Sequence, residues 1–452
     1  MVRTSRWERL LPAVPALAAA FLILTLRVGQ IPLVLGAVLA VAGCGFIALL
    51  ALPERQGVAI AMIIAGFFAG TALRVGLLDI ADVSLIGAFG LLILSSKGTE
   101  PTSRRRTGAL VGGLALIAAG GLFGSLFEPS IDTGALRAGY QGSDLGPIPA
   151  QFADVIRFLI FTAGLILLVR AWGPTRRQAT AVLFAYGTGV AVNALYGTFL
   201  GAEFAGRARG FASHPVFFGL ICAFGVVVGW GITVSGGRGQ RLFGLFVMGS
   251  AGIGLLQSGT RSSLLVAVLG LLIYQAGNRS LRSTTALAVF ALVALTVAVF
   301  GSNLVSDTPT LTRLSGGGQA EISNAERSKA REETNELIRH RGITGAGFRY
   351  LIPPHNLLLG IIAAAGMLGF IGFLVITLAM GSHLVATARG DPLFGSVLAA
   401  GMGVFSCFWV VNPGWDRWMW LPIAVVLGAS TGRAATASED ESAPAQHPSW
   451  TQ

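Results

Sequence analysis

The chain has 452 residues, of which 53% are hydrophobic and only 12% are charged, and its formal net charge is +11. Soluble globular proteins carry about 25% charged residues, so this composition excludes an ordinary soluble domain. The basic residues are dispersed among short segments and form no recognisable nucleic-acid module, so we expect no nucleic-acid partner. Long apolar runs predict an all-α, polytopic bundle of transmembrane helices rather than a β-barrel.

Apolar runs of bilayer-crossing length predict about 12–14 spans. They lie at residues 10–26, 31–52, 57–73, 75–95, 107–127, 154–171, 179–200, 214–234, 242–257, 262–276, 285–304, 356–380, 393–411 and 418–430. The predicted organisation is therefore transmembrane helices 1–11 within residues 1–301, an extracytoplasmic loop at 302–354, C-terminal spans within 355–432 and a disordered cytoplasmic tail at 433–452. The first run also resembles a secretory signal, but its length favours a retained helix.

The distribution of basic residues predicts the orientation. With the amino terminus inside, 17 Lys and Arg residues fall in inner segments and 8 in short outer segments. Short cytoplasmic loops carry the excess of positive charge, so the long loop and His355 are expected outside. The predicted location is the bacterial cytoplasmic (inner) membrane, in contact with membrane lipids and with an extracytoplasmic active face.

Three of the predicted outer loops carry arginines at membrane edges. These arginines are Arg207 and Arg209 in 206–215, Arg261 in 258–263, and Arg327 and Arg339 in the long loop. Guanidinium groups bind phosphate oxygens bidentately and stay ionised, so they suit a lipid pyrophosphate headgroup. Contact with ordinary lipid headgroups or structural pairing is the alternative interpretation.

The long loop contains one predicted amphipathic helix, at 323–340, started by Ser323 or Asn324. Pro353 and Pro354 then stiffen the approach to the next span and position His355 at its start. No histidine pairs with Cys or a carboxylate at metal-ligand spacing, so no metal is expected. The cysteines Cys44, Cys222 and Cys407 lie in apolar runs and are interpreted as buried hydrophobic residues.

His355-Asn356, nine residues, Gly366, two residues and Gly369 give the pattern H-N-x9-G-x2-G. This pattern resembles the signature of the O-antigen ligase and Wzy-type polymerase superfamily of membrane glycan transferases. Further elements resemble the family in order and placement: Arg207-Ala208-Arg209-Gly210-Phe211 with His214-Pro215, Gly259-Thr260-Arg261-Ser262-Ser263, and Arg327 with Gly345-Ala346-Gly347. Two positions depart from it, because Arg331 replaces a common aromatic residue and His214 a common Asn.

The resemblance implies transfer of a polyprenyl-pyrophosphate-linked glycan onto an acceptor hydroxyl of a glycan, lipid or wall polymer, without cofactor or metal. It implies that His355 is the general base, with Asn356 orienting it or the acceptor. Arg207, Arg209 and Arg261 would bind the pyrophosphate, with Arg327 and Arg339 as possible loop contacts. Ligase and polymerase are not distinguished.

The alternative function is a membrane transporter or flippase for a lipid-linked or anionic substrate. Such a protein would more often show two related halves and broken helices at the membrane midplane. A scaffold lacking chemistry is a third hypothesis, but it would not require arginines at three separate outer edges.

Overall fold

The structure is a computed structural model, and it describes residues 54–75, 78–95, 104–126, 155–201, 203–204, 206–278, 309–310, 320–348, 356–409 and 416–441. The helices there are α4 (Glu54–Thr71), α5 (Ile80–Ser95), α6 (Arg104–Ser125), π-helix η1 (Ile160–Gly164), α9 (Leu165–Trp172), α10 (Arg176–Phe199), α11 (Pro215–Ser235), α12 (Arg238–Gln257), α13 (Arg261–Asn278), α17 (Ala320–Arg341), α18 (Leu357–Ala388), α19 (Pro392–Ser406) and α20 (Arg417–Glu441). Two short antiparallel hairpins complete the described part: β1 (Arg74–Val75) with β2 (Leu78–Asp79), and β3 (Glu203–Phe204) with β4 (Arg207–Ala208). This architecture confirms the predicted all-α polytopic class.

Six helices in the described part are long and apolar enough to cross a membrane. They are Thr107–Ser125, Val155–Trp172, Arg176–Phe199, Pro215–Ser235, Arg238–Gln257 and Leu357–Ala388. Shorter apolar helices cover Gln56–Thr71, Ile80–Ile93, Pro392–Ser406 and Arg417–Ala429. The predicted spans at 10–26, 31–52 and 285–304 lie outside the described residues.

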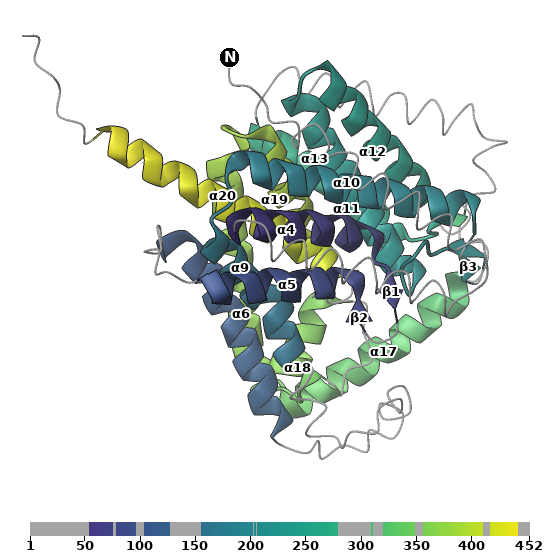
Figure 1. Ribbon diagram of the computed structural model, residues 1–452. Coiled ribbons are helices and arrows are strands. Elements are labelled where there is room, and N and C mark those ends of the chain that lie inside the picture. Colours follow the sequence, from purple (N-terminus) through teal and green to yellow (C-terminus); the bar gives the residue numbers. More distant parts are fainter. Residues whose placement is uncertain are drawn as a thin grey trace, which may run out of the picture.

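Helix α11 forms the centre of the bundle, because protein buries 89% of its most apolar 18-residue stretch. In α12 the corresponding value is 39%, and Leu242, Leu245 and Phe246 remain exposed. A helix that is buried on all sides has apolar residues on every face, whereas a helix at the edge of a bundle presents its apolar side chains to lipid. In Figure 1, α4, α5 and α10 run roughly side by side, and α6 and α18 cross the view steeply.

Helix α18 is broken at Gly366, which adopts φ 61° and ψ −149° inside the span. In an unbroken helix the Met367 N–H would donate to the Ala363 carbonyl oxygen. Here Met367 N–H donates instead to the Ile343 carbonyl (3.1 Å), and the Ala363 carbonyl accepts from Ala346 N–H (2.9 Å). The segment after α17 thus supplies the partners that the break removes.

Helix α17 confirms the predicted loop helix, with one correction at its start. The helix begins at Ala320, so Ser323 and Asn324 lie inside it rather than at its cap. No Gly or Pro interrupts the chain between Ala320 and Ser323, so nothing local stops the helix there. Its buried face, Ala330, Thr334 and Leu337, covers the region of the break in α18.

Glycines let α6 approach α18 closely on the other side. A methyl group on Gly113 would lie 2.8 Å from the Gly372 carbonyl oxygen, and one on Gly124 would lie 2.7 Å from the Gly345 carbonyl carbon. Small residues at such crossings allow backbone contact between membrane helices. The loop after α17 is therefore enclosed between α6 and α18.

The C-terminal segment differs from the prediction. Helix α20 continues to Glu441, whereas the sequence predicted a disordered tail from residue 433. The added residues are mostly Ala, Ser and Glu without Gly or Pro, and Ala and Glu favour helix. Figure 1 shows the end of α20 projecting from the bundle.

Replacing Gly366 by alanine tests the break in α18. The new methyl group would collide with the Ile343 carbonyl, and an alanine would have to adopt a φ of 61° and a ψ of −149°, which only glycine adopts readily. We therefore expect a loss of about 1–3 kcal/mol of stability. Gly381→Ala in the same helix meets only Met402 Cε at 3.9 Å and serves as the control. Thermal unfolding of both variants in detergent measures the difference. Equal melting temperatures would contradict the role of Gly366.

Candidate functional site

The helix ends that flank the predicted outer loops gather on one face of the described bundle. We call it the arginine face and define it by the hairpin β3–β4 with residues 209–214, the turn 258–260, helix α17 and the start of α18. Contacts between these segments, described below, bring together residues far apart in the sequence.

Asn193, buried in α10, anchors the segment that carries Arg207 and Arg209. Its Oδ1 accepts from Phe211 N–H (2.8 Å), and its Nδ2 donates to the Gly70 carbonyl at the end of α4 (3.3 Å). The Phe211 ring stacks on Tyr196 with 4.0 Å between ring centroids. These contacts fix the loop over the ends of two helices.

Arg207 binds the turn between α12 and α13. Its Nε donates to the Ser258 carbonyl (2.8 Å), and its Nη2 donates to Thr260 Oγ1 (2.9 Å). Gly259 has φ +63°, and a methyl group there would lie 2.8 Å from Arg207 Nε. Gly259 and Thr260 therefore form the turn and also contact the Arg207 side chain. Arg207 thus uses its Nε and Nη2 groups in hydrogen bonds within the protein.

Arg261 extends from the same turn to the long loop. It is the first residue of α13, and its Nη2 donates to Asn324 Oδ1 on α17 (2.9 Å). The described residues thus link Arg207 to Arg261 through the turn, and Arg261 to α17 through Asn324.

His214 lies beside these cations. Its Nδ1 accepts from Val216 N–H (3.1 Å) and caps α11, so the neutral ring carries its proton on Nε2. Burial lowers the pKa of His214, and the charges of Arg207 and Arg327 lower it further. The imidazole is therefore held neutral, with Nε2–H as a donor.

Helix α17 connects this cluster to the start of α18. Asn324, Arg327 and Arg331 recur at helical spacing. Arg331 Nη2 donates to the Trp409 carbonyl (3.1 Å). The neighbouring Phe408 carbonyl accepts from Leu357 N–H (2.6 Å) at the start of α18. Asn324 and Arg331 are separated by about 10 Å of helix, so Arg261 and the start of α18 share one face.

Asn356 is the N-cap of α18. Its Oδ1 accepts from Leu359 N–H (2.9 Å), which leaves the Nδ2 donors for another partner. The predicted base, His355, lies outside the described residues.

Arg209 and Arg339 differ from the other arginines. No hydrogen bond or ion pair links the half-buried Arg209 guanidinium to another residue in the described part of the chain. Arg339 is 78% exposed and pairs with Glu336 (3.4 Å). The next residue, His340, binds the same carboxylate. About 18 Å of helix separates it from Arg327, so the structure does not bring Arg339 to the cluster.

Sequence reasoning missed two interactions, the contact of Asn324 with Arg261 and the buried ion pair Asp82–Arg417. Arg417 Nε lies 2.5 Å from Asp82 Oδ1, Nη2 donates to Oδ2 (2.8 Å), and both side chains are at most 5% exposed. Arg417 also lies over Phe161, 4.4 Å from the ring centroid. A carboxylate in an apolar run requires a partner, so Asp82 was the signal for this pair.

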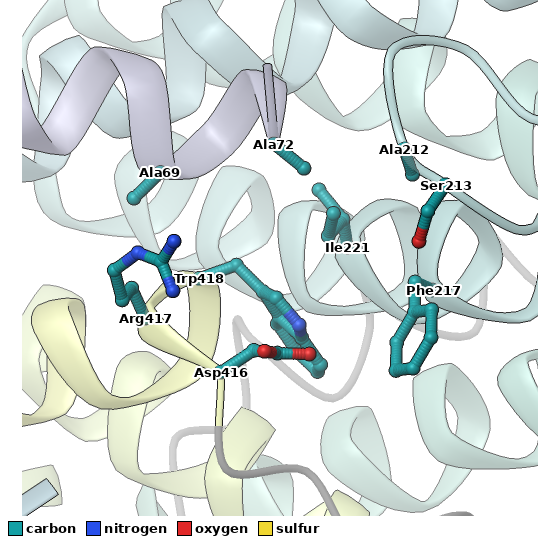
Figure 2. A pocket seen from close by; sticks show the side chains of 9 residues that line it. All are labelled: Ala69, Ala72, Ala212, Ser213, Phe217, Ile221, Asp416, Arg417 and Trp418. Carbon is teal, nitrogen blue, oxygen red and sulfur yellow. The ribbon is translucent and has the colours of Figure 1, made fainter. Parts of the chain in front are cut away.

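A pocket opens beside the ion pair, on the side of the arginine face. It measures about 380 Å³ including the open space at its mouth, and Figure 2 shows its lining. The lining residues are Ala69, Ala72, Ala212, Ser213, Phe217, Ile221, Asp416, Arg417 and Trp418. They come from the end of α4, the segment before α11, α11 itself and the start of α20.

Among the described residues, no three His, Cys, Asp or Glu side chains gather in a group that could hold a metal ion. Comparison of the chain with protein-family models, with curated proteins and with solved structures finds no match. The fold and the site are therefore interpreted from the chain's own residues.

The pair Arg207 and Arg209 separates structural from ligand-binding roles. We expect Arg207→Ala to lower stability by about 1–3 kcal/mol, because the Ser258 carbonyl and Thr260 hydroxyl lose their donors. Arg209→Ala should change stability by less than about 0.5 kcal/mol, since the Arg209 side chain binds no described residue. Thermal unfolding of both variants measures this difference, and equal losses would contradict the assignment.

The lowered pKa of His214 leads us to predict that stability depends on pH. Its pKa is lower in the folded protein than in the unfolded chain, so the unfolded chain binds the proton first as pH falls. The stability due to the neutral ring is present above about pH 6.5 and is lost as pH falls through the folded pKa. We expect His214→Asn, which keeps a capping side chain, to flatten melting temperature between pH 7.5 and 5.5. An unchanged slope would contradict this.

Proposed function

We propose that this protein transfers a glycan from a polyprenyl pyrophosphate to an acceptor hydroxyl at the extracytoplasmic face of a bacterial cytoplasmic membrane. The observation that carries the proposal is the convergence of Arg207, Arg261 and Arg327 with neutral His214 on one face. Arg207 belongs to strand β4, Arg261 begins α13, Arg327 lies within α17 and His214 caps α11, so segments far apart in the sequence contribute to the cluster.

The charge of the cluster supports a phosphate ligand. Like charges held close repel one another, and a bound dianion relieves that repulsion. A pyrophosphate at a helix edge keeps its polyprenyl chain in the membrane while its oxygens meet the guanidinium groups. Arg261 and Arg209 would provide the main contacts, because Arg207 already donates to the turn. Nε2–H of His214 would add a neutral donor.

In the proposed reaction the acceptor oxygen forms a bond to the anomeric carbon, and the bond from that carbon to the pyrophosphate oxygen breaks. Polyprenyl pyrophosphate leaves, and the arginines stabilise its growing negative charge. The proton of the acceptor hydroxyl moves to the predicted base His355. Direct attack inverts the configuration at the anomeric carbon. No cofactor takes part in this scheme.

A transporter or flippase is the second candidate, because α18 is broken inside the span. In a transporter the exposed backbone of such a break binds substrate. Here the Ala346 and Gly347 N–H groups donate to the carbonyl oxygens of Ala363 and Ala364. These hydrogen bonds favour a structural role for the break and support glycan transfer over transport.

The experiment compares His355→Ala with His340→Ala in a deletion strain that expresses each variant. His340 is exposed and pairs with Glu336, so its loss should leave glycan transfer intact. Loss of the base should reduce transfer by about 100-fold or more and leave the lipid-linked donor in the outer leaflet. Enzymatic labelling of intact spheroplasts measures the donor in that leaflet. Accumulation in the inner leaflet would instead indicate a flippase.

A further inference from the structure

The turn that follows α17 carries the most exposed large hydrophobic side chain in the described part of the chain. Ile343 is 80% exposed, although its carbonyl oxygen accepts from Met367 N–H at the break in α18 (3.1 Å). The residues just after it, 345–347, are buried beside α6 and α18. The backbone of this turn is therefore fixed, while no protein covers the side chain at its tip.

Helix α18 places the turn at one edge of the hydrocarbon layer. Its part after the break, residues 367–388, measures about 33 Å, and the hydrocarbon core of a bilayer is about 30 Å thick. Arg389 follows this part, and arginines near helix ends reach the interface with water. Since Arg389 marks one edge of the layer, Gly366 and the adjoining Ile343 carbonyl lie at the opposite edge.

Helix α6 gives the same depth independently. It begins at Arg104, and its apolar stretch Thr107–Ser125 has 19 residues, or about 28 Å of helix. The far end of this stretch meets the turn, because a methyl group on Gly124 would lie 2.7 Å from the Gly345 carbonyl carbon. Figure 1 shows α17 reaching α6 and α18 in this region. Ile343 therefore lies where the protein surface passes from water into lipid.

Exposed apolar side chains continue from Ile343 along both helices. Phe123 and Leu126 are exposed on either side of the glycine contact in α6, and Met367 and Leu368 are exposed just after the break in α18. In a membrane protein such a continuous apolar surface faces acyl chains. Transfer of the isoleucine side chain from water to lipid is favourable, so the bilayer itself is the partner that fits this tip.

We propose that the turn at residues 342–344 is a membrane anchor, with Ile343 inserted among the acyl chains of the adjacent lipid leaflet. At its other end α17 binds Arg261 through Asn324. Lipid at one end and the arginine face at the other thus hold α17 along the membrane surface. The anchor requires a bilayer but no glycan transfer, so it goes beyond the proposed function.

The test measures the depth of residue 343 in the full-length protein, reconstituted in vesicles of phosphatidylethanolamine and phosphatidylglycerol. A nitroxide label is attached to the Ile343→Cys variant in a background of Cys44→Ala, Cys222→Ala and Cys407→Ala. Collisions of the label with dissolved oxygen, which concentrates in lipid, are compared with collisions with a water-soluble nickel chelate. We expect the label at residue 343 to favour oxygen.

Two further labelled positions calibrate the depth. Ser328→Cys lies on the exposed side of α17 and should favour nickel. Leu378→Cys is exposed on α18, about 16 Å beyond Met367, and should favour oxygen most strongly. A nickel preference at residue 343 equal to that at residue 328 would overturn the anchor. A label that neither reagent reaches would also overturn it, because protein would then cover the tip.

A second pair of variants tests the anchor without a label. A carboxylate at an exposed position in water has little effect, whereas a carboxylate in lipid is costly and would draw the turn out of the leaflet. The Ala346 and Gly347 N–H groups, which donate to α18 carbonyls, should then exchange with solvent about tenfold faster in Ile343→Asp than in Ile343→Leu. Equal exchange rates in the two variants would show that residue 343 lies in water.

Discussion

A membrane offers no water to backbone groups, and the broken helix α18 satisfies this constraint with atoms from outside itself. Gly366 interrupts the helix, and residues 343–347 supply the missing donors and acceptor. This exchange holds the end of α17 in the bundle. From there α17 extends to Arg261 at one contact and to Trp409 at another. The position of the arginine face therefore depends on a backbone interaction within the span.

Charge is arranged in two ways, one at the arginine face and one beside it. Arg417 is neutralised by Asp82 in a site where neither charge reaches water, and such a pair holds α20 against α5. Arg207 and Arg261 instead donate to neutral oxygens, and the charges of Arg207 and Arg327 lower the pKa of His214. Cations gathered in this way repel one another, and this repulsion is the reason why an anionic ligand is proposed for the cluster.

Sequence patterns predicted the loop helix and the glycine motif, but not their relation. The run without Gly or Pro predicted α17 to within a few residues. Its predicted start was wrong because the same kind of sequence continues back to Ala320, and Asn324 lies inside the helix, where it binds Arg261. Gly366 and Gly345 were known only as matches to a family pattern. Their meaning, a break and the segment that fills it, requires two pieces of chain in contact. Asn193 was a lone amide in an apolar run, and the sequence contained no information on its two partners.

By itself the sequence determined the class of protein and the location of most described spans, because hydropathy and length act locally and a bilayer selects for both. It also determined which residues carry fixed positive charge. Only the tertiary structure decided which arginines meet, that Arg339 stays with Glu336, and that Asp82 pairs with Arg417 across more than three hundred residues. Such pairings depend on how helices pack in three dimensions, and hydropathy along one chain does not encode which helix ends become neighbours.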